Sequence, residues 1–262
     1  MADEPEVITE RRDAVLVVRI NRPEKRNALN GAVMAGIGKA ITEADSSSDI
    51  RAIVLTGTGD RSFCAGMDLA AFAGGGLSPS AEDQQYMGTF MNFMSKGQAE
   101  TPVIGAAQAT ALAGGFELLM ACDLTVASES AQFGLPEVKR GLFAAGGGMF
   151  LSRRIPLAKA LELTLTGDPI DAAEAVRLGL INKAVPADKV LDEAVALAER
   201  VAANGPLGVQ ATKKLMRMAA FEPASDVWAL HGELQGKVFS SEDAREGATA
   251  FVEKRPPVWK GR

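Results

Sequence analysis

The sequence has few of the residues that most metal centres and nucleophilic sites need. It contains one histidine, His231, and two cysteines, Cys64 and Cys122. A single imidazole disfavours histidine-rich metal sites and leaves a serine triad only one possible base. Two thiols cannot build a disulfide framework or a four-thiolate zinc site. We therefore expect a protein without a metal, working in a reducing compartment, the cytoplasm.

Long apolar runs and blocks of basic charge are also missing. Residues 1–10 are acidic and lack the apolar segment of a signal peptide. No apolar run reaches the roughly 18 residues expected of a membrane span. The 28 Lys and Arg against 33 Asp and Glu give a net charge of −5, which argues against general nucleic-acid binding. A few local cations could still hold an anionic ligand.

Apolar residues make up 47% of the 262, enough for the core of one large domain or two modest ones. Short β-branched runs and helical periodicity alternate in the first part of the chain, which predicts an α/β fold of stacked ββα turns. The expected strands cover 14–20, 52–55, 102–107 and 124–127. The expected helices cover 27–44, 81–96 and 114–121, and the Gly-, Ser- and Pro-rich stretch 73–80 predicts a loop.

After Pro156 the pattern becomes helical. Helices are expected over 158–165, 171–178, 189–203, 209–219, 225–237 and 242–253. Asp171 can cap the start of its helix, and Gly179 can end it. We therefore divide the chain into an α/β core, 1–190, and a helical region, 191–262. Helices with little sheet to cover often pack on neighbouring subunits.

Two glycine-containing segments could present backbone amides to a ligand. In the segment 62–69, Gly66 can adopt a positive φ and turn the amide of Met67 into a cavity, although an ordinary turn is the alternative. In the segment 111–118, Gly114 and Gly115 open an apolar helix whose first amides lack intrahelical partners. Glu117 follows one turn inside that helix, either complementing the helix dipole or serving as a functional group at the base of a pocket.

A second carboxylate stands in the segment 132–138. Gly134 and Pro136 form a stiff turn that would present Glu137, although a solvated loop glutamate is the common alternative. Residues 141–148 follow with a triple glycine, which indicates either backbone crowding around a ligand or a flexible loop.

The order and spacing of these segments resemble the crotonase superfamily, the enoyl-CoA hydratases and isomerases. The resemblance spans nearly the whole chain. Its motifs are Asn21-Arg22-Pro23, Asn27-Ala28-Leu29, Ile53 to Gly57, Phe63 to Leu69, Ala113 to Leu118, Ala121-Cys122-Asp123, Gln132 to Glu137, Leu165 to Asp168, Ala172 to Leu180 and Glu246 to Phe251.

This resemblance implies a crotonase-like superhelix of ββα turns with a C-terminal helical trimerisation region, as a homotrimer or a hexamer of two trimers. It implies an acyl-CoA ligand and no separate cofactor, because coenzyme A is part of the substrate. The amides of Met67 and Gly114 match the oxyanion hole for the thioester oxygen, and Ala65 matches the backbone position that contacts adenine. Asp68 and Leu69 fall beside these positions and are assigned to substrate binding.

Glu117 and Glu137 match the two acidic positions that decide the reaction within the superfamily. Both are glutamates in hydratases, so we expect an enoyl-CoA hydratase of acyl-CoA catabolism, such as fatty-acid β-oxidation. Glu117 would activate water for attack on C3, and Glu137 would deliver a proton to C2. A Δ3-Δ2-enoyl-CoA isomerase that needs only Glu137, another crotonase-type lyase, and a non-catalytic acyl-CoA-binding protein are the alternatives.

Two positions depart from the common hydratase pattern. Ala145 stands where a glycine amide often helps to hold the water, and we keep it as a substrate-binding position. Phe116 replaces a smaller residue beside Glu117 and is expected to narrow the pocket. The coenzyme A phosphates need cations, for which Lys25 and Arg26 match the family. Lys254 and Arg255 are further candidates, from this subunit or a neighbour.

Overall fold

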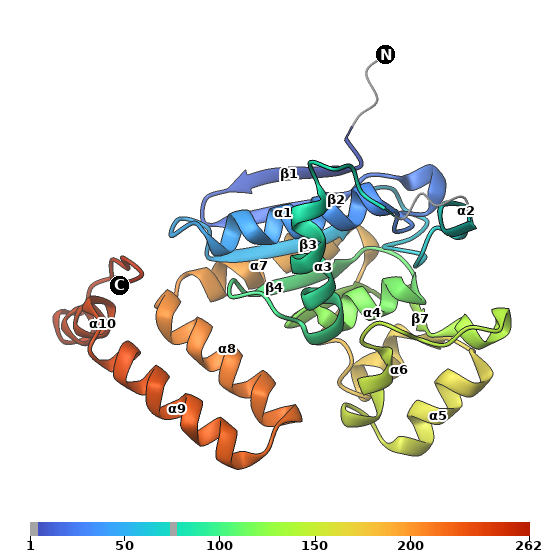
Figure 1. Cartoon of the computed structure of the whole chain (residues 1–262). Helices are drawn as coiled ribbons and strands as arrows, with labels where there is room; N and C mark the ends of the chain where they lie inside the picture. Colours follow the sequence, from blue (N-terminus) through green and yellow to red (C-terminus); the bar gives the residue numbers. More distant parts are fainter. Residues whose placement is uncertain (1–4, 74–77) are drawn as a thin grey trace.

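In the computed structural model, residues 5–73 and 78–262 are described, so 74–77 of the expected loop lie outside the description. Two sheets organise the core (Figure 1). The larger sheet has the order β1-β2-β3-β4-β6-β9, with bounds Val7–Arg12, Val15–Ile20, Ala52–Gly57, Val103–Ala107, Leu124–Ser128 and Lys183–Val185. The smaller has the order β5-β7-β8, with bounds Ala111–Leu112, Gln132–Gly134 and Ile170–Asp171.

The helices follow the expected rhythm. The α-helices are α1 Gly31–Asp45, α2 Leu69–Ala73, α3 Gln84–Lys96, α4 Gly114–Ala121, α5 Leu157–Thr166, α6 Ala172–Arg177, α7 Val190–Ala202, α8 Pro206–Phe221, α9 Ala224–Phe239 and α10 Glu242–Glu253. The 3₁₀ helices are η1 Pro23–Lys25, η2 Pro136–Arg140, η3 Gly148–Arg153 and η4 Ala187–Lys189. Asp171 caps α6 as expected, since its carboxylate accepts from the amide of Glu174.

The central strands are mostly apolar because both faces of the sheet are covered. Along β2, Leu16 and Val18 belong to the cluster that packs under α1 and α3, whereas Val15 and Val17 belong to the cluster shared with α7. This alternation is the period of two that a strand imposes. In the larger sheet, β2, β3, β4, β6 and β9 run parallel, and among its described strands β1 alone is antiparallel to its neighbour.

Several elements differ from the sequence-based expectation, which included none of β5, β7, β8, β9 and α2. Two further differences have a clear physical cause. β1 was not expected; its residues are only half-buried or exposed, as befits an edge strand with a mixed sequence. α1 begins at Gly31 and not at residue 27, because Asn27 has a φ of 55° and the side chain of Asn30 caps the helix by accepting from Val33.

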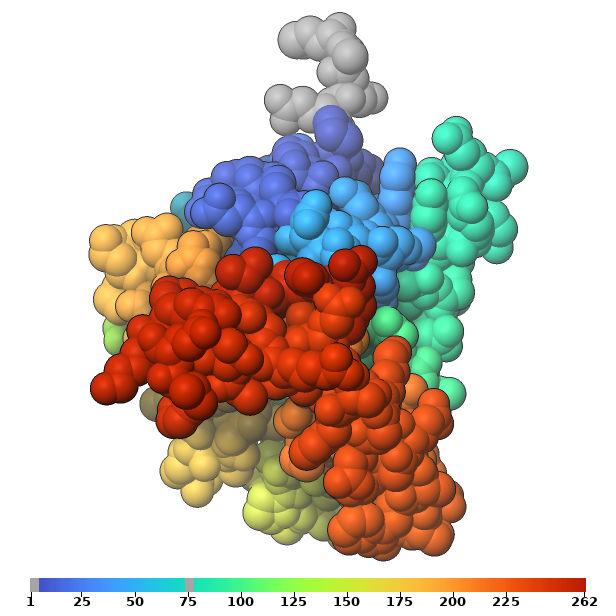
Figure 2. All heavy atoms as spheres, turned by 90° about the vertical axis from the view of Figure 1, so that its left-hand side faces the viewer, coloured from blue at the N-terminus to red at the C-terminus, as the bar shows by residue number. Residues whose placement is uncertain are grey.

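The C-terminal region begins later than the division at 190/191 places it. α7 contributes Val190, Ala194 and Ala198 to the cluster on the sheet, so it belongs to the core. By contrast, α8 and α9 contain no buried residue. They lie side by side and extend away from the sheet, and α10 lies at the end of α9, near the start of α8 (Figure 1). After α10, the indole nitrogen of Trp259 donates to the carbonyl of Ala203 at 2.8 Å. Figure 2 shows these helices covering much of one face of the molecule.

Candidate active site

The start of α4 is built for close backbone approach. A Cβ on Gly115 would overlap the carbonyl of Cys64, so only glycine lets the helix sit against that segment. The preceding residue, Ala113, has φ 52° and ψ −134°, a conformation that a side chain rarely adopts. Its amide donates to the carbonyl of Gly134 at 2.9 Å, which fixes this turn to the smaller sheet.

The two amides expected to form an oxyanion hole lie close together. Gly66 has a φ of 91°, and a Cβ on it would lie 3.0 Å from the amide nitrogen of Gly114. A Cβ on Gly114 would lie 3.7 Å from the amide nitrogen of Met67. Neither amide donates to another residue within 5–73 or 78–262. Leu29 holds the Met67 segment by donating to the carbonyl of Gly66 at 2.8 Å.

The Glu117 carboxylate is held by backbone amides. The residue is 4% exposed, and its Oε1 accepts from the amides of Gly146 at 2.9 Å and Gly148 at 2.8 Å. A Cβ on Gly148 would lie 2.8 Å from that oxygen, so the triple glycine provides room for the carboxylate. Burial raises the pKa of Glu117, and the two amides oppose the rise. Oε2 accepts no bond from the part of the chain that the structure describes.

Glu137 stands on η2, directly after the smaller sheet. It is half-buried, and its Oε2 has no hydrogen-bond partner among the described residues although it is shielded from solvent. Burial raises the pKa of Glu137, and the negative charge of Glu117 raises it further. The two carboxylates therefore influence each other's protonation, as expected for acids that share one site.

The residues expected to bind coenzyme A form a second group. The amide of Ala65 donates to the carbonyl of Arg26 at 3.1 Å, which places the adenine position beside the loop of Lys25 and Arg26. Both of these side chains are exposed. Leu69, the first residue of α2, is 46% exposed and can contact a ligand.

Asp68 has another task in this structure. Its Oδ2 accepts from Nη2 of Arg22 at 3.0 Å, and its Oδ1 accepts from the amides of Ala70 and Ala71. These bonds hold the pKa of the Asp68 carboxyl below its usual range. The carboxylate thus anchors the residue next to Met67, and the expected substrate contact is not what its bonds indicate. No role at the site was predicted for the buried Arg22. Its ion pair with Asp68 could not be predicted from local sequence, because the two residues are 46 positions apart.

Three further positions can be compared with expectation. The ring of Phe116 is 1% exposed and packs against Phe133 at a centroid distance of 5.8 Å, so it fills the core and does not narrow a pocket. Ala145 is exposed, and the amides that contact Glu117 come from its neighbours. Arg255 pairs with Glu246 and Glu253, which occupies its guanidinium group.

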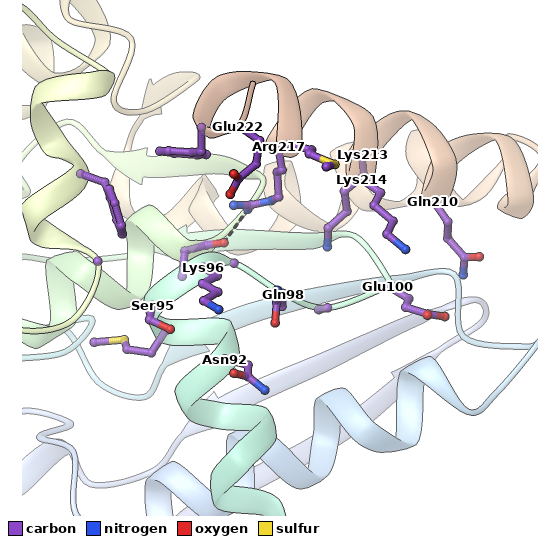
Figure 3. Close-up of a pocket in the computed structure, with 18 of the residues that line it drawn as sticks. Asn92, Ser95, Lys96, Gln98, Glu100, Gln210, Lys213, Lys214, Arg217 and Glu222 are labelled. Atoms are coloured by element: carbon purple, nitrogen blue, oxygen red, sulfur yellow. Dashed lines mark hydrogen bonds between the residues drawn. The ribbon is translucent and has the colours of Figure 1, made fainter. Parts of the chain in front are cut away.

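A cavity of about 960 Å³ adjoins the carboxylate of Glu117. Its walls come from the end of α3, the loop before η3, and the helices α8 and α9. Figure 3 shows Lys213, Lys214 and Arg217 projecting from α8 toward the segment that contains Lys96 and Gln98. Met67, Gly114 and Glu137 do not line this cavity, so it extends on the far side of Glu117.

The two cysteines are not activated as nucleophiles. Cys64 and Cys122 are free and buried, and burial raises the pKa of both thiols to about 12. The described ranges contain no group of three or more His, Cys, Asp or Glu placed to hold a metal ion. Within the same ranges, no helix combines the length and apolar character of a membrane span.

Comparison with known proteins places this arrangement in context. The family model of enoyl-CoA hydratase/isomerase matches residues 10–262. The chain is 41% identical over 260 residues to the enoyl-CoA hydratase EchA19 of Mycobacterium tuberculosis, covering 98% of this chain and 97% of that protein. It is 35% identical over 252 residues to the short-chain-enoyl-CoA hydratase of Clostridium acetobutylicum, covering 95% of each.

A solved structure agrees. The crystal structure of a probable enoyl-CoA hydratase/isomerase from Mycobacterium abscessus superposes with a TM-score of 0.89 at 46% identity, covering 99% of this chain and 100% of that one. The expected crotonase fold is thereby confirmed. The chain belongs to the enoyl-CoA hydratase/isomerase family.

Proposed function

We propose that the protein is an enoyl-CoA hydratase that adds water reversibly across the C2=C3 bond of a trans-2-enoyl-CoA. The observation that carries this proposal is that the chain offers both a pair of shielded carboxylates, Glu117 and Glu137, and two backbone amides that lie close to each other, those of Met67 and Gly114. Hydration needs a base for water, an acid for carbon, and donors for the thioester oxygen, and this arrangement can supply all three.

The hydrogen bonds favour a division of roles between the two acids. Glu117 accepts from two amides, which stabilise its ionised form and leave Oε2 free to accept a proton from water. Glu137 has an unpartnered Oε2 and lies in the field of Glu117, so its protonated form is favoured. We therefore assign Glu117 to water activation at C3 and Glu137 to proton delivery at C2.

The amides of Met67 and Gly114 are assigned to the thioester oxygen, which gains negative charge as water adds at C3. Losing one donor of this kind typically lowers the rate by about 10²–10³. Residue 114 has to remain glycine, because its own backbone amide must approach the thioester oxygen closely. Methionine at position 67 is compatible with the role, because its backbone alone takes part.

The test follows the ultraviolet absorbance of the enoyl thioester of crotonyl-CoA. Glu117→Gln and Glu137→Gln should each slow its loss by about 10²–10⁴, the usual contribution of a general acid or base. Glu43→Gln, at an exposed glutamate of α1, is the matched control and should retain full activity. Full activity in either of the first two variants would refute the assigned role. If Glu137→Gln abolishes activity, Glu117→Gln retains it, and the wild type consumes a 3-enoyl-CoA, the protein is an isomerase.

We further propose that the C-terminal helices form a subunit interface, in a homotrimer or a hexamer of two trimers. Large apolar side chains are exposed there, including Trp228 at 70%, Phe239 at 75% and Phe251 at 86%. Such exposure supports contact with another subunit, above all on α9, which carries Trp228 and Phe239 and contains no buried residue. Sedimentation of the purified chain tests it, and a monomer would refute it. The two free cysteines are compatible with the cytoplasm as its location.

A further inference from the structure

The cavity beside Glu117 is lined in part by the loop whose amides bind the Glu117 carboxylate. The amides of Gly146 and Gly148 bind Glu117, and a Cβ on Gly147 between them would lie 3.1 Å from the carbonyl of Met94. Gly147 and Met94 both line the cavity. A chain extending from C3 of a bound enoyl group past Glu117 would therefore enter this space.

Basic side chains outnumber acidic ones along the cavity wall. The basic side chains are Lys96, Arg153, Arg154, Lys213, Lys214, Arg217 and Lys237, and the acidic ones are Asp45, Glu100, Glu117 and Glu222. In Figure 3 the lysines of α8 point toward the segment that carries Lys96, so two elements contribute cations to the lining of the cavity. Apolar side chains such as Met94, Phe150 and Leu151 also line the cavity and can pack against the methylene groups of an acyl chain. A chain end that covers the cations, however, removes their hydration, and an anionic end replaces it with a charge pair.

Only part of this charge is compensated by the protein. Lys213 and Arg217 share the carboxylate of Asp123, at 2.8 and 2.7 Å. Arg154 donates to the carbonyl of Met120 at 2.7 Å. Within the described parts of the chain, no carboxylate forms an ion pair with Arg154, Lys96 or Lys214.

The positive field also acts on Arg154 itself. Burial lowers the pKa of its guanidinium, and the neighbouring charge of Arg217 lowers it further. A second anion in the cavity would relieve this repulsion.

We infer that this cavity receives the end of the acyl chain distal to the thioester, and that this end is a carboxylate. The substrate class is then the CoA thioesters of 2-enoic acids that carry a second, terminal carboxyl group. This inference rests on the proposed hydratase function, because it uses Glu117 to place C3. The carboxylate would pair with Lys96, Arg154 or Lys214, which have no carboxylate partner among the described residues.

The experiment compares acyl chains of equal length with and without the terminal carboxylate. For turnover, six- and eight-carbon trans-2-enedioyl-CoA is measured against the corresponding trans-2-enoyl-CoA. For binding, adipoyl-CoA is measured against hexanoyl-CoA by calorimetry. One charge pair near a protein surface should favour the dicarboxylic ligand about five- to tenfold at low salt. The preference should shrink as added salt screens the pair.

Substitutions then locate the preference. Lys96→Gln and Lys214→Gln remove exposed lysines of the wall, so the fold should be kept, and each should lower the ratio of dicarboxylic to monocarboxylic kcat/KM. Lys96→Glu should reverse the preference. Lys39→Gln, at an exposed lysine of α1 outside the cavity, should leave the ratio unchanged.

The outcomes separate this inference from the proposed function. Equal binding of adipoyl-CoA and hexanoyl-CoA, or tighter binding of the latter, overturns the carboxylate specificity even if the enoyl substrates are hydrated. Absence of turnover for every enoyl-CoA overturns the hydratase function, while the binding ratio still decides the specificity. If Lys96→Gln and Lys214→Gln change sedimentation and affect both ligands equally, the cations serve a subunit contact and the inference is wrong.

Discussion

Ala113 offers a sharp test of how the site is built. Its φ of 52° with ψ −134° lies in a region that is essentially reserved for glycine, and strain of this kind costs about 1–3 kcal/mol. The conformation is held by its amide bond to Gly134 and by its carbonyl, which accepts from Phe116 and Glu117. Ala113→Gly should relieve the strain at these fixed positions.

The net effect is the difference between two terms. Glycine loses about 0.5–1 kcal/mol of additional conformational entropy on folding, which offsets part of the relief. We therefore expect Ala113→Gly to raise the free energy of unfolding by up to about 2.5 kcal/mol. Because the amide of Gly114 stays in place, activity on crotonyl-CoA should be retained.

Denaturant unfolding followed by circular dichroism measures this change. The control is Ala160→Gly, at a buried alanine inside α5, which should lower the free energy of unfolding by about 1 kcal/mol. The two alanine-to-glycine changes thus have opposite expected signs. Destabilisation of Ala113→Gly by as much as Ala160→Gly would show that the backbone at residue 113 is unstrained, and the reasoning would fail.

Two further predictions concern the carboxylates. Gly148→Ala places a methyl group 2.8 Å from Oε1 of Glu117 and should disturb the backbone amides that hold this carboxylate. Crotonyl-CoA hydration should then fall at least tenfold, by the order of magnitude of one lost carboxylate contact, with near-native circular dichroism. An unchanged kcat would show that hydration does not depend on this hold on Glu117. Burial raises the pKa of Glu137 from 4.5, so this group favours the folded state below the unfolded pKa and loses that contribution as pH rises through the folded value. Glu137→Gln should therefore be more stable than the wild type at pH near 8, with a gain that shrinks toward pH near 4, by thermal unfolding across pH; a gain that grows on acidification would contradict it.

Local pattern was sufficient for most of the core. The β-branched, mostly apolar run of β2 predicted that strand, and the patterns of 114–121 and 242–253 predicted α4 and α10 with the bounds that the structure gives them. β1 was not predicted, because an edge strand with one exposed face has a mixed sequence, here Val-Ile-Thr-Glu-Arg-Arg. The division at 190/191 failed to foresee that α7 packs on the sheet, since helical periodicity does not reveal which surface a helix covers.

The site divides in the same way. Spacing and resemblance named Met67, Gly114, Glu117 and Glu137, and the structure places the two amides together and couples the two acids. Neither indicated that the triple glycine binds Glu117 directly, because that contact joins amides 29 and 31 positions away. Long-range pairings of this kind leave no mark on local composition. The ion pair between Arg22 and Asp68 was missed for the same reason.

The unfavourable features of this fold gather at one place. The positive φ of Ala113 shapes the turn before the Gly114 amide, and the positive φ of Gly66 turns that of Met67. Among the described residues, Glu137 has a shielded oxygen without a hydrogen-bond partner, in the field of the Glu117 carboxylate. Each feature weakens the folded state on its own, and each keeps a donor or a proton available to a ligand. Stability and catalysis therefore oppose each other here, and substitutions that relieve the acids should stabilise the protein while stopping hydration.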